Sequence, residues 1–128
     1  MTRSDEIQTD EMQQAVAHSV THLVDMCHGI ARERGWHETR REVPTLLMLT
    51  VAELAEAMEA DRKGMMDDHL PGRIGLEVEL ADAVIRICDL AGLLDLDLGG
   101  ALVEKMAYNV TRADHRPEAR AAHHGKKY

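Results

Sequence analysis

Aromatic residues are almost absent from this chain of 128 residues, which has no Phe, one Trp and two Tyr. Its apolar residues are mostly Leu, Val, Ile, Ala and eight Met, a set that favours helices over strands. Strand signals are also missing, because no segment alternates cleanly between polar and apolar residues and no Asn-Gly or Asp-Gly turn occurs. The composition therefore predicts an all-α fold.

Cysteines and long apolar runs are scarce as well. The two cysteines, Cys27 and Cys88, stand in apolar helical surroundings, and we expect buried free thiols rather than a disulfide. The polar, acidic start is unlike a signal peptide, and no apolar run approaches the roughly 20 residues that span a bilayer. These absences predict a cytoplasmic protein that does not act at a membrane.

Positive charge is in short supply, and the net charge is −8 at pH 7. A protein that binds a nucleic acid polymer needs a basic face to displace counterions, so such a partner is not expected. An acidic chain can instead gather carboxylates around cations. The tail that begins at Arg112 is the one basic region.

Hydrophobic periodicity predicts four helices with short connections in one domain. The expected divisions are a flexible N-terminus over 1–10, a helical domain over 11–115 and a basic tail over 116–128. The helices should run from about 10 to 35, 44 to 64, 74 to 94 and 98 to 115, the second with Pro44 in its first turn. Apolar stripes at helical spacing should face the core, among them Val16, Val20, Leu23, Leu47, Val51, Leu54, Met58, Leu80, Val84 and Ile87.

Two pairs of acidic residues share a spacing of three, Glu53 with Glu56 and Glu79 with Asp82. At about 100° per residue, this spacing places both carboxylates of a pair on one helix face, one turn apart. Four carboxylates on two adjacent helices repel one another, and a hard divalent cation relieves the repulsion. Oxygen ligands make Mg²⁺, Mn²⁺ and Ca²⁺ candidates, and Mg²⁺ is the expected ion, with Mn²⁺ as a substitute. The alternative is that both pairs lie on solvated faces, where Glu is common.

The neighbours of these pairs favour the metal site. The positions four residues after Glu53, Glu56 and Glu79 are all Ala, so no Lys or Arg stands there to form a surface ion pair. Only Arg86, four residues after Asp82, is placed to do so. Glu59 and Asp89 extend the two acidic stripes further along their helices. They lie either behind the metal ligands or at exposed positions.

The run AELAEAMEADRKG followed by EVELADAVIRICDLAG resembles the MazG-like, all-α nucleoside triphosphate pyrophosphohydrolases. Their signature is E-x-x-E, a spacer and E-x-x-D. The stretch EKMAYNVTRADH with HHGKKY is similar to the family's C-terminal pattern of Lys, Asn and Arg before a short basic tail. The resemblance covers roughly residues 44–128. It implies a four-helix MazG-like bundle that assembles as a homodimer or homotetramer.

The resemblance also implies an activity, the Mg²⁺-dependent hydrolysis of a nucleoside or deoxynucleoside triphosphate to the monophosphate and pyrophosphate, which clears unwanted nucleotides. Glu53, Glu56, Glu79 and Asp82 would hold the metal, and Glu53 or Glu56 would take a proton from the attacking water. The expected substrate contacts are Lys105, Asn109 and Arg112 to phosphate or sugar, Trp36 to the base, and His22 and Lys126 nearby. The alternative for each is an ordinary solvated, core or tail position.

Two other functions fit the same residues. One is a helical interaction or metal-buffering protein, and the other is a regulator that binds a nucleotide alarmone without turnover. Self-association is expected for a physical reason too, because a thin bundle with 45% hydrophobic residues leaves apolar surface to bury.

Overall fold

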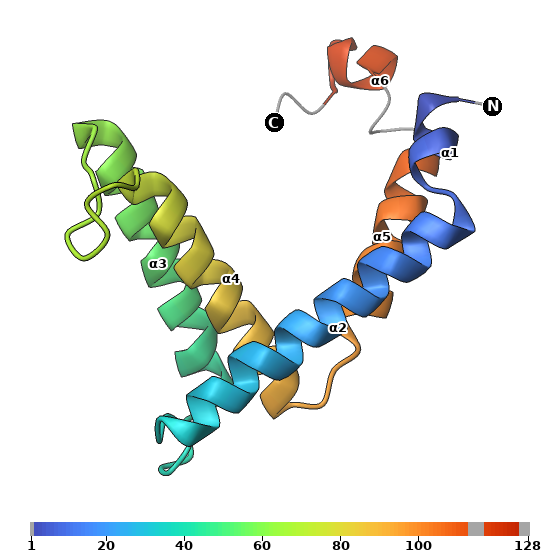
Figure 1. Ribbon diagram of the computed structural model, residues 1–128. Helices are drawn as coiled ribbons and strands as arrows, with labels where there is room; N and C mark the ends of the chain where they lie inside the picture. The colour runs from blue at the N-terminus through green and yellow to red at the C-terminus, as the bar shows by residue number, and fades with distance from the viewer. Residues whose placement is uncertain (1, 113–116, 126–128) are drawn as a thin grey trace. The chain divides into compact units, whose positions relative to one another are not determined.

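The computed structural model describes residues 2–112 and 117–125, and all regular structure in them is helical (Figure 1). One isolated β-bridge pairs Met66 with Ile74. The expected all-α fold is confirmed. The helices are α1 (Arg3–Ile7), α2 (Asp10–Glu33), α3 (Val43–Lys63), α4 (Gly75–Leu93), α5 (Leu98–Thr111) and α6 (Pro117–Ala121). In the described part of the chain, no helix has both the length and the apolar character that a membrane crossing needs.

The chain divides into two compact units. One unit comprises residues 22–96 and contains α3, α4 and the second part of α2. The other comprises residues 1–21 and 97–128, with α1, α5, α6 and the first part of α2. In this second unit the backbone of Gly99 lies against the backbone of Ala17, where a β-carbon would collide with the Ala17 carbonyl oxygen.

The four long helices begin and end close to their predicted limits. Pro44 lies in the first turn of α3, where its missing N–H costs no hydrogen bond. Gly64 ends α3 in the left-handed conformation, with φ of 60°, and its N–H donates to the carbonyls of Ala60 and Asp61. Gly35 turns the chain after α2 with φ of 82°. Proline and glycine thus mark these ends as the sequence indicates.

Two short helices were not predicted. In α1, the Thr2 hydroxyl accepts a hydrogen bond from the N–H of Asp5, while the Asp5 carboxylate accepts one from the N–H of Thr2. This reciprocal capping stabilises the first turn of α1, which lies within the predicted N-terminal segment 1–10. Pro117 begins α6 within the predicted tail. Helix α5 ends at Thr111, and residues 113–116 lie outside the described residues.

Helices α3 and α4 lie side by side and antiparallel, joined by the 64–74 connection (Figure 1). Their contact is lined by small residues, since Ala57, Ala60 and Ala83 are all buried. At the start of α4, the N–H of Gly75 donates to the Met65 carbonyl at 2.8 Å. A β-carbon on Gly75 would lie 2.9 Å from that carbonyl oxygen, so the close approach requires glycine.

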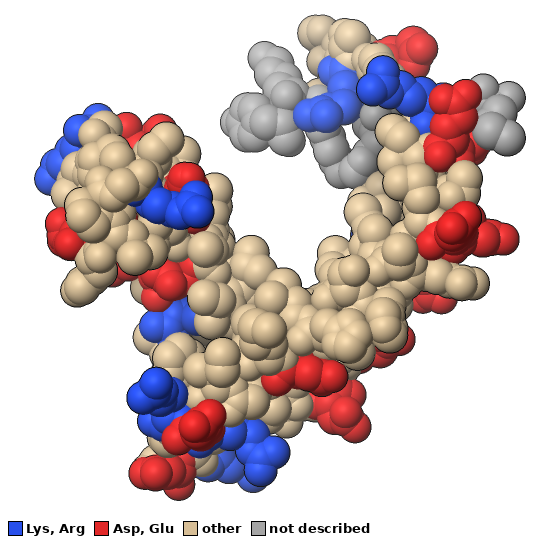
Figure 2. Space-filling model, viewed as in Figure 1, with Lys and Arg blue, Asp and Glu red and all other residues tan. Residues whose placement is uncertain are grey.

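The predicted apolar stripes of α3 and α4 do not form a core within the chain. Because alanines fill the contact between the two helices, the bulky side chains project elsewhere and are 43–59% exposed: Leu47, Val51, Leu54, Met58, Leu80, Val84 and Ile87. Their assignment to a core within the chain was therefore wrong. Figure 2 shows uncharged surface over much of the visible face of α4. On α2, Val16 and Leu23 are exposed as well, whereas Val24 is buried.

Both cysteines are buried and free, as expected. Burial raises the pKa of the Cys27 thiol and of the Cys88 thiol, so both stay protonated.

Candidate metal centre

Three of the four predicted carboxylates converge between α3 and α4. Glu53 and Glu56 lie one turn apart on α3, and Glu79 lies on α4. One carboxylate oxygen from each residue lies within 4.8 Å of the other two. The antiparallel packing of the two helices across small residues therefore forms the cluster that the spacing predicts.

Glu79 is the most perturbed group of this cluster. Its Oε2 atom is buried and has no hydrogen-bond partner among the described residues. Burial raises the pKa of Glu79 to about 7, helped by its hydrogen bond to Glu53 and by the negative charge of Glu56. Glu79 therefore keeps its proton to a much higher pH than an ordinary glutamate does.

Glu53 is held in the opposite state. Its Oε1 atom accepts a hydrogen bond from Nε of Arg86 at 2.7 Å. Burial acts to raise the pKa of Glu53, but the hydrogen bonds from Arg86 and Glu79 and the positive charge of Arg86 together bring it below its usual value. Glu53 is thus an ionised anchor, and Glu79 holds the proton that the two carboxylates share.

Asp82 lies one turn beyond Glu79 on α4 and is not part of the three-oxygen group. Burial raises its pKa, followed by the negative charges of Glu53 and Asp67, while Arg86 acts against them. The negative charge of the cluster therefore also acts on Asp82. Beside the cluster, a pocket of about 300 Å³ is lined by Glu56 and Glu79 together with Asp67, Asp68 and His69 of the 64–74 connection.

The donor set fits a hard divalent cation. All three converging groups offer oxygen, the ligand that Mg²⁺ and Mn²⁺ prefer. A buried, unpartnered oxygen on Glu79 is an open ligand position, and a cation would replace the proton that now relieves the repulsion. Glu56 is exposed and faces the pocket, so an ion there would remain accessible to a substrate.

Arg86 connects this cluster to Trp36, a link that the sequence did not indicate. The Arg86 guanidinium lies 5.9 Å from the centre of the Trp36 ring while its Nε holds Glu53. Trp36 is 41% exposed, which rules out the role of a core plug. Trp36 and Arg86 both line a second pocket of about 480 Å³ with Gly35, Glu38, Thr39 and Arg41. The sequence paired Arg86 with Asp82 along one helix, whereas its partner lies on α3.

The other predicted substrate contacts are divided between the two units and the undescribed residues. Lys105, Asn109 and Arg112 are on α5 or at its end, in the unit of residues 1–21 and 97–128. Lys105 Nζ and Arg112 Cζ lie 4.7 and 5.9 Å from the centre of the Tyr108 ring, and Oδ1 of Asn109 is buried without a partner in the described part. His22 is an exposed residue of α2 in the unit of the carboxylates. Lys126 lies outside the described residues.

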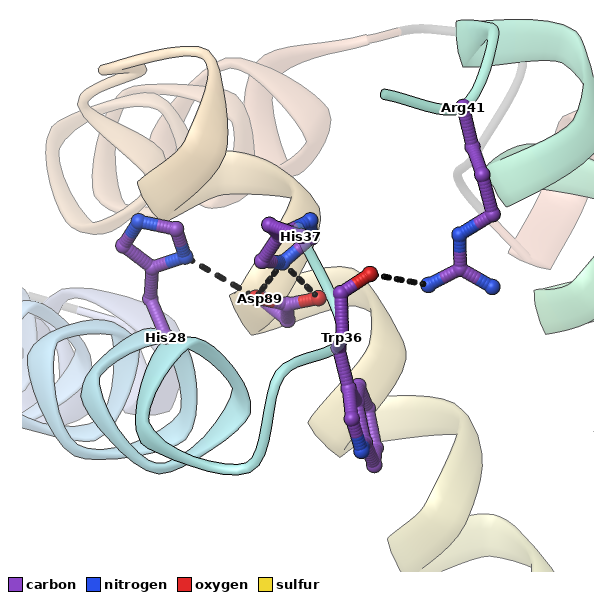
Figure 3. Close-up of polar contacts among 5 residues, drawn as sticks. All are labelled: His28, Trp36, His37, Arg41 and Asp89. Carbon is purple, nitrogen blue, oxygen red and sulfur yellow. Dashed lines mark hydrogen bonds and ion pairs between the residues drawn. The ribbon is translucent and has the colours of Figure 1, made fainter. Parts of the chain in front are cut away.

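A second group of potential ligands was missed by sequence reasoning. His28 of α2, His37 of the loop after it and Asp89 of α4 meet around one carboxylate (Figure 3). Asp89 is 4% exposed. The prediction that Asp89 could simply be an exposed surface residue is therefore wrong. The position of Asp89 between Cys88 and Ala91, which are buried on α4, was the one indication in the sequence that Asp89 is buried. Nothing in the sequence linked Asp89 to the two histidines, because they come from distant segments.

Comparisons of the chain with protein families, with curated proteins and with solved structures found no match. The resemblance to the MazG-like family therefore stays a prediction that depends on the paired acidic motif.

Proposed function

We propose that the chain is a Mg²⁺-dependent pyrophosphohydrolase of nucleoside or deoxynucleoside triphosphates. The observation that supports this best is the convergence of Glu53, Glu56 and Glu79 beside an open pocket. A triphosphate is strongly anionic, so an acidic pocket can accept it only when divalent cations lie between carboxylates and phosphates.

The roles of the three glutamates follow from their surroundings. A bound ion supplies polarisation of the phosphate and a lower pKa for a bound water. Glu53 is engaged by Arg86 and Glu79 has a buried oxygen, so both are suited to hold an ion. Glu56 is exposed at the pocket and is suited to accept the water's proton. The water oxygen then bonds to the α-phosphorus, the bond to the bridging oxygen breaks, and pyrophosphate leaves.

Trp36 and Arg86 are the proposed contacts on the nucleoside side. The exposed indole offers a stacking face, and the guanidinium beside it offers a positive charge. Lys105, Asn109 and Arg112 remain proposed contacts to phosphate or sugar, as do His22 and Lys126, and substitution of each tests its contribution.

The proposed assembly is a homodimer or homotetramer. The bulky apolar side chains of α3 and α4 are exposed, and each is worth roughly 1.5–3 kcal/mol when fully buried. A second copy of the chain offers the same apolar surface and can cover it symmetrically. Sedimentation at micromolar concentration should give at least twice the mass of 14.3 kDa.

A nucleotide panel with Mg²⁺ tests the activity, with pyrophosphate and orthophosphate measured separately. Pyrophosphate should be released by the natural chain, and E53Q and E79Q should abolish its release while keeping the helical content. The matched control is E77Q, because Glu77 is an exposed glutamate of α4 that pairs with Arg73. Orthophosphate as the sole product would refute attack at the α-phosphorus.

One observation favours a second function, a non-catalytic nucleotide-binding or helical interaction protein of the same fold. The proton shared by Glu53 and Glu79 relieves their repulsion without any ion, so the cluster is also compatible with a purely structural role. Binding of a nucleotide without turnover, or no effect of E53Q beyond a change in stability, would favour this function.

A further inference from the structure

The cluster of His28, His37 and Asp89 brings two imidazoles to one buried carboxylate (Figure 3). Nδ1 of His28 lies 2.9 Å from Oδ1 of Asp89, and Nε2 of His37 lies 2.9 Å from Oδ1 and 3.0 Å from Oδ2. The side chains are 18%, 14% and 6% exposed, in the order His28, His37 and Asp89. Three separate segments of the chain thus direct potential ligand atoms at one shielded point.

Glycines at two backbone positions allow the segments that carry His28, His37 and Asp89 to lie close together. Gly92, one turn after Asp89, lies against His28, and a β-carbon there would come within 2.5 Å of the His28 β-carbon. The turn at Gly35 reverses the chain after α2, and the N–H of Trp36 donates to the Ala31 carbonyl at 3.0 Å. This reversal places the His37 ring 5.4 Å from the His28 ring.

We propose that His28, His37 and Asp89 bind a divalent transition-metal ion of the Zn²⁺ class. Two imidazole nitrogens and one carboxylate oxygen are ligands that Zn²⁺ prefers and Mg²⁺ does not. The three ligand atoms lie within 4.8 Å of one another. Three protein ligands leave a fourth tetrahedral position for water or a solute.

The two separations between a ring nitrogen and the Asp89 oxygen are close to those of a tetrahedral ion site, and the two ring nitrogens lie within 4.8 Å of each other. Tetrahedral ligands at about 2.0–2.1 Å from Zn²⁺ stand roughly 3.3–3.4 Å apart, so the present separations of 2.9 Å must widen by about half an ångström. Ion binding also requires the hydrogens of the two ring nitrogens to leave. In the ion-bound state each imidazole carries its hydrogen on the other ring nitrogen, and Asp89 offers a carboxylate oxygen as ligand.

This site is distinct from the carboxylate centre and does not depend on the proposed function. Asp89 lies seven residues after Asp82, about 10 Å further along α4. A pocket of about 220 Å³, lined by His37, Arg40, Arg41 and Leu94 among others, gives access to His37. A bound ion would join the loop that carries Trp36 to α2 and α4.

Co²⁺ titration of the chelator-treated full chain tests the proposal, with millimolar Mg²⁺ present to occupy the carboxylate centre. We expect the visible spectrum of a tetrahedral Co²⁺ ion, with one ion per chain, displaced by Zn²⁺. H28N and H37Q are matched variants, because each amide keeps a donor for Asp89 and removes a ligand nitrogen. Each should weaken binding by at least about 100-fold, whereas E53Q should leave it unchanged.

The proposal is contradicted if the Co²⁺ ion binds to other residues of the chain or does not bind. Loss of the spectrum only in the H18A/H22A or H123A/H124A variant would place the ion on those histidine pairs and overturn the proposal. A thiolate charge-transfer band in the near ultraviolet would assign the ion to Cys27 or Cys88 and overturn it too. No Co²⁺ or Zn²⁺ binding at micromolar concentration would leave Asp89 as a hydrogen-bond acceptor only. As a second measurement, Zn²⁺ should raise the Tm of the natural chain but not that of H37Q.

Discussion

Nε of Arg86 on α4 donates to Oε1 of Glu53 on α3 at 2.7 Å, and this contact crosses the two helices that form the carboxylate centre. It keeps Glu53 ionised and at the same time sets a positive charge beside the Trp36 ring.

Replacing Arg86 by Gln should therefore weaken both sides of the proposed site. Without the guanidinium, the pKa of Glu53 rises, and Mg²⁺ must compete with a proton. We expect kcat/KM for triphosphate hydrolysis to fall by about tenfold or more, since a charge-assisted hydrogen bond is worth roughly 1.5–3 kcal/mol. R73Q is the control, because Arg73 pairs with Glu77 on the exposed start of α4 at 3.5 Å. Equal kcat/KM values for R86Q and R73Q would contradict the assigned role.

The raised pKa of Glu79 predicts an unusual dependence of stability on pH. The folded chain holds a proton on Glu79 up to about pH 7, whereas an ordinary Glu loses it near 4.5. Glu79 therefore stabilises the metal-free fold fully below pH 4.5, and this contribution is lost as the pH rises through 7. The Tm in a chelator should show this decline for the natural chain and less of it for E79Q. A pH profile of E79Q identical to that of the natural chain would refute the shift.

The same proton links Mg²⁺ binding to pH. An ion that takes oxygens from Glu79 must displace the proton, so Mg²⁺ should bind more tightly at pH 8 than at pH 6. Isothermal titration in two buffers of different ionisation enthalpy measures the protons released. E77Q should release as many as the natural chain, and E79Q should release fewer.

Glu56 is the proposed general base, which predicts a specific kinetic defect. E56Q should lower kcat by about 100-fold or more, the usual range for loss of a positioned base. Because Glu53 and Glu79 remain, the substrate should still bind. A large rise in KM with unchanged kcat would instead make Glu56 a binding residue only.

Substitution by Ala should have opposite effects at two of the helical glycines, Gly29 and Gly92. G92A should destabilise the fold by about 1–3 kcal/mol, because the added methyl group meets His28. Gly29 has nothing within 4 Å of its β-carbon position, so G29A should stabilise α2 by about 0.5–1 kcal/mol. Urea unfolding of both variants measures the difference. A neutral G92A would show that α2 and α4 can separate at this point without cost.

The local features of the fold were predictable because their causes are local. Pro44 and Gly64 mark the ends of α3 through backbone chemistry alone. The spacing of Glu53 and Glu56 likewise depends only on the helical period.

The remaining features depend on which helix faces meet. Alanines at 57, 60 and 83 form the contact between α3 and α4, so the larger apolar residues did not form the predicted core. Periodicity alone could not distinguish these two faces. The meeting of His28 with Asp89 joins positions 61 residues apart, and no spacing rule connects them.

Cys88 is the largest side chain that is fully buried among the described residues. The other buried apolar residues are mostly alanine, with Cys27, Val24 and Leu46, so the unfolding of a single chain exposes little apolar surface to water. The heat-capacity change of unfolding for an isolated chain should then be small for its length. If the exposed faces of α3 and α4 join copies of the chain, unfolding of the assembly exposes these faces as well, and most of the heat-capacity change comes from them. The melting temperature then depends on protein concentration.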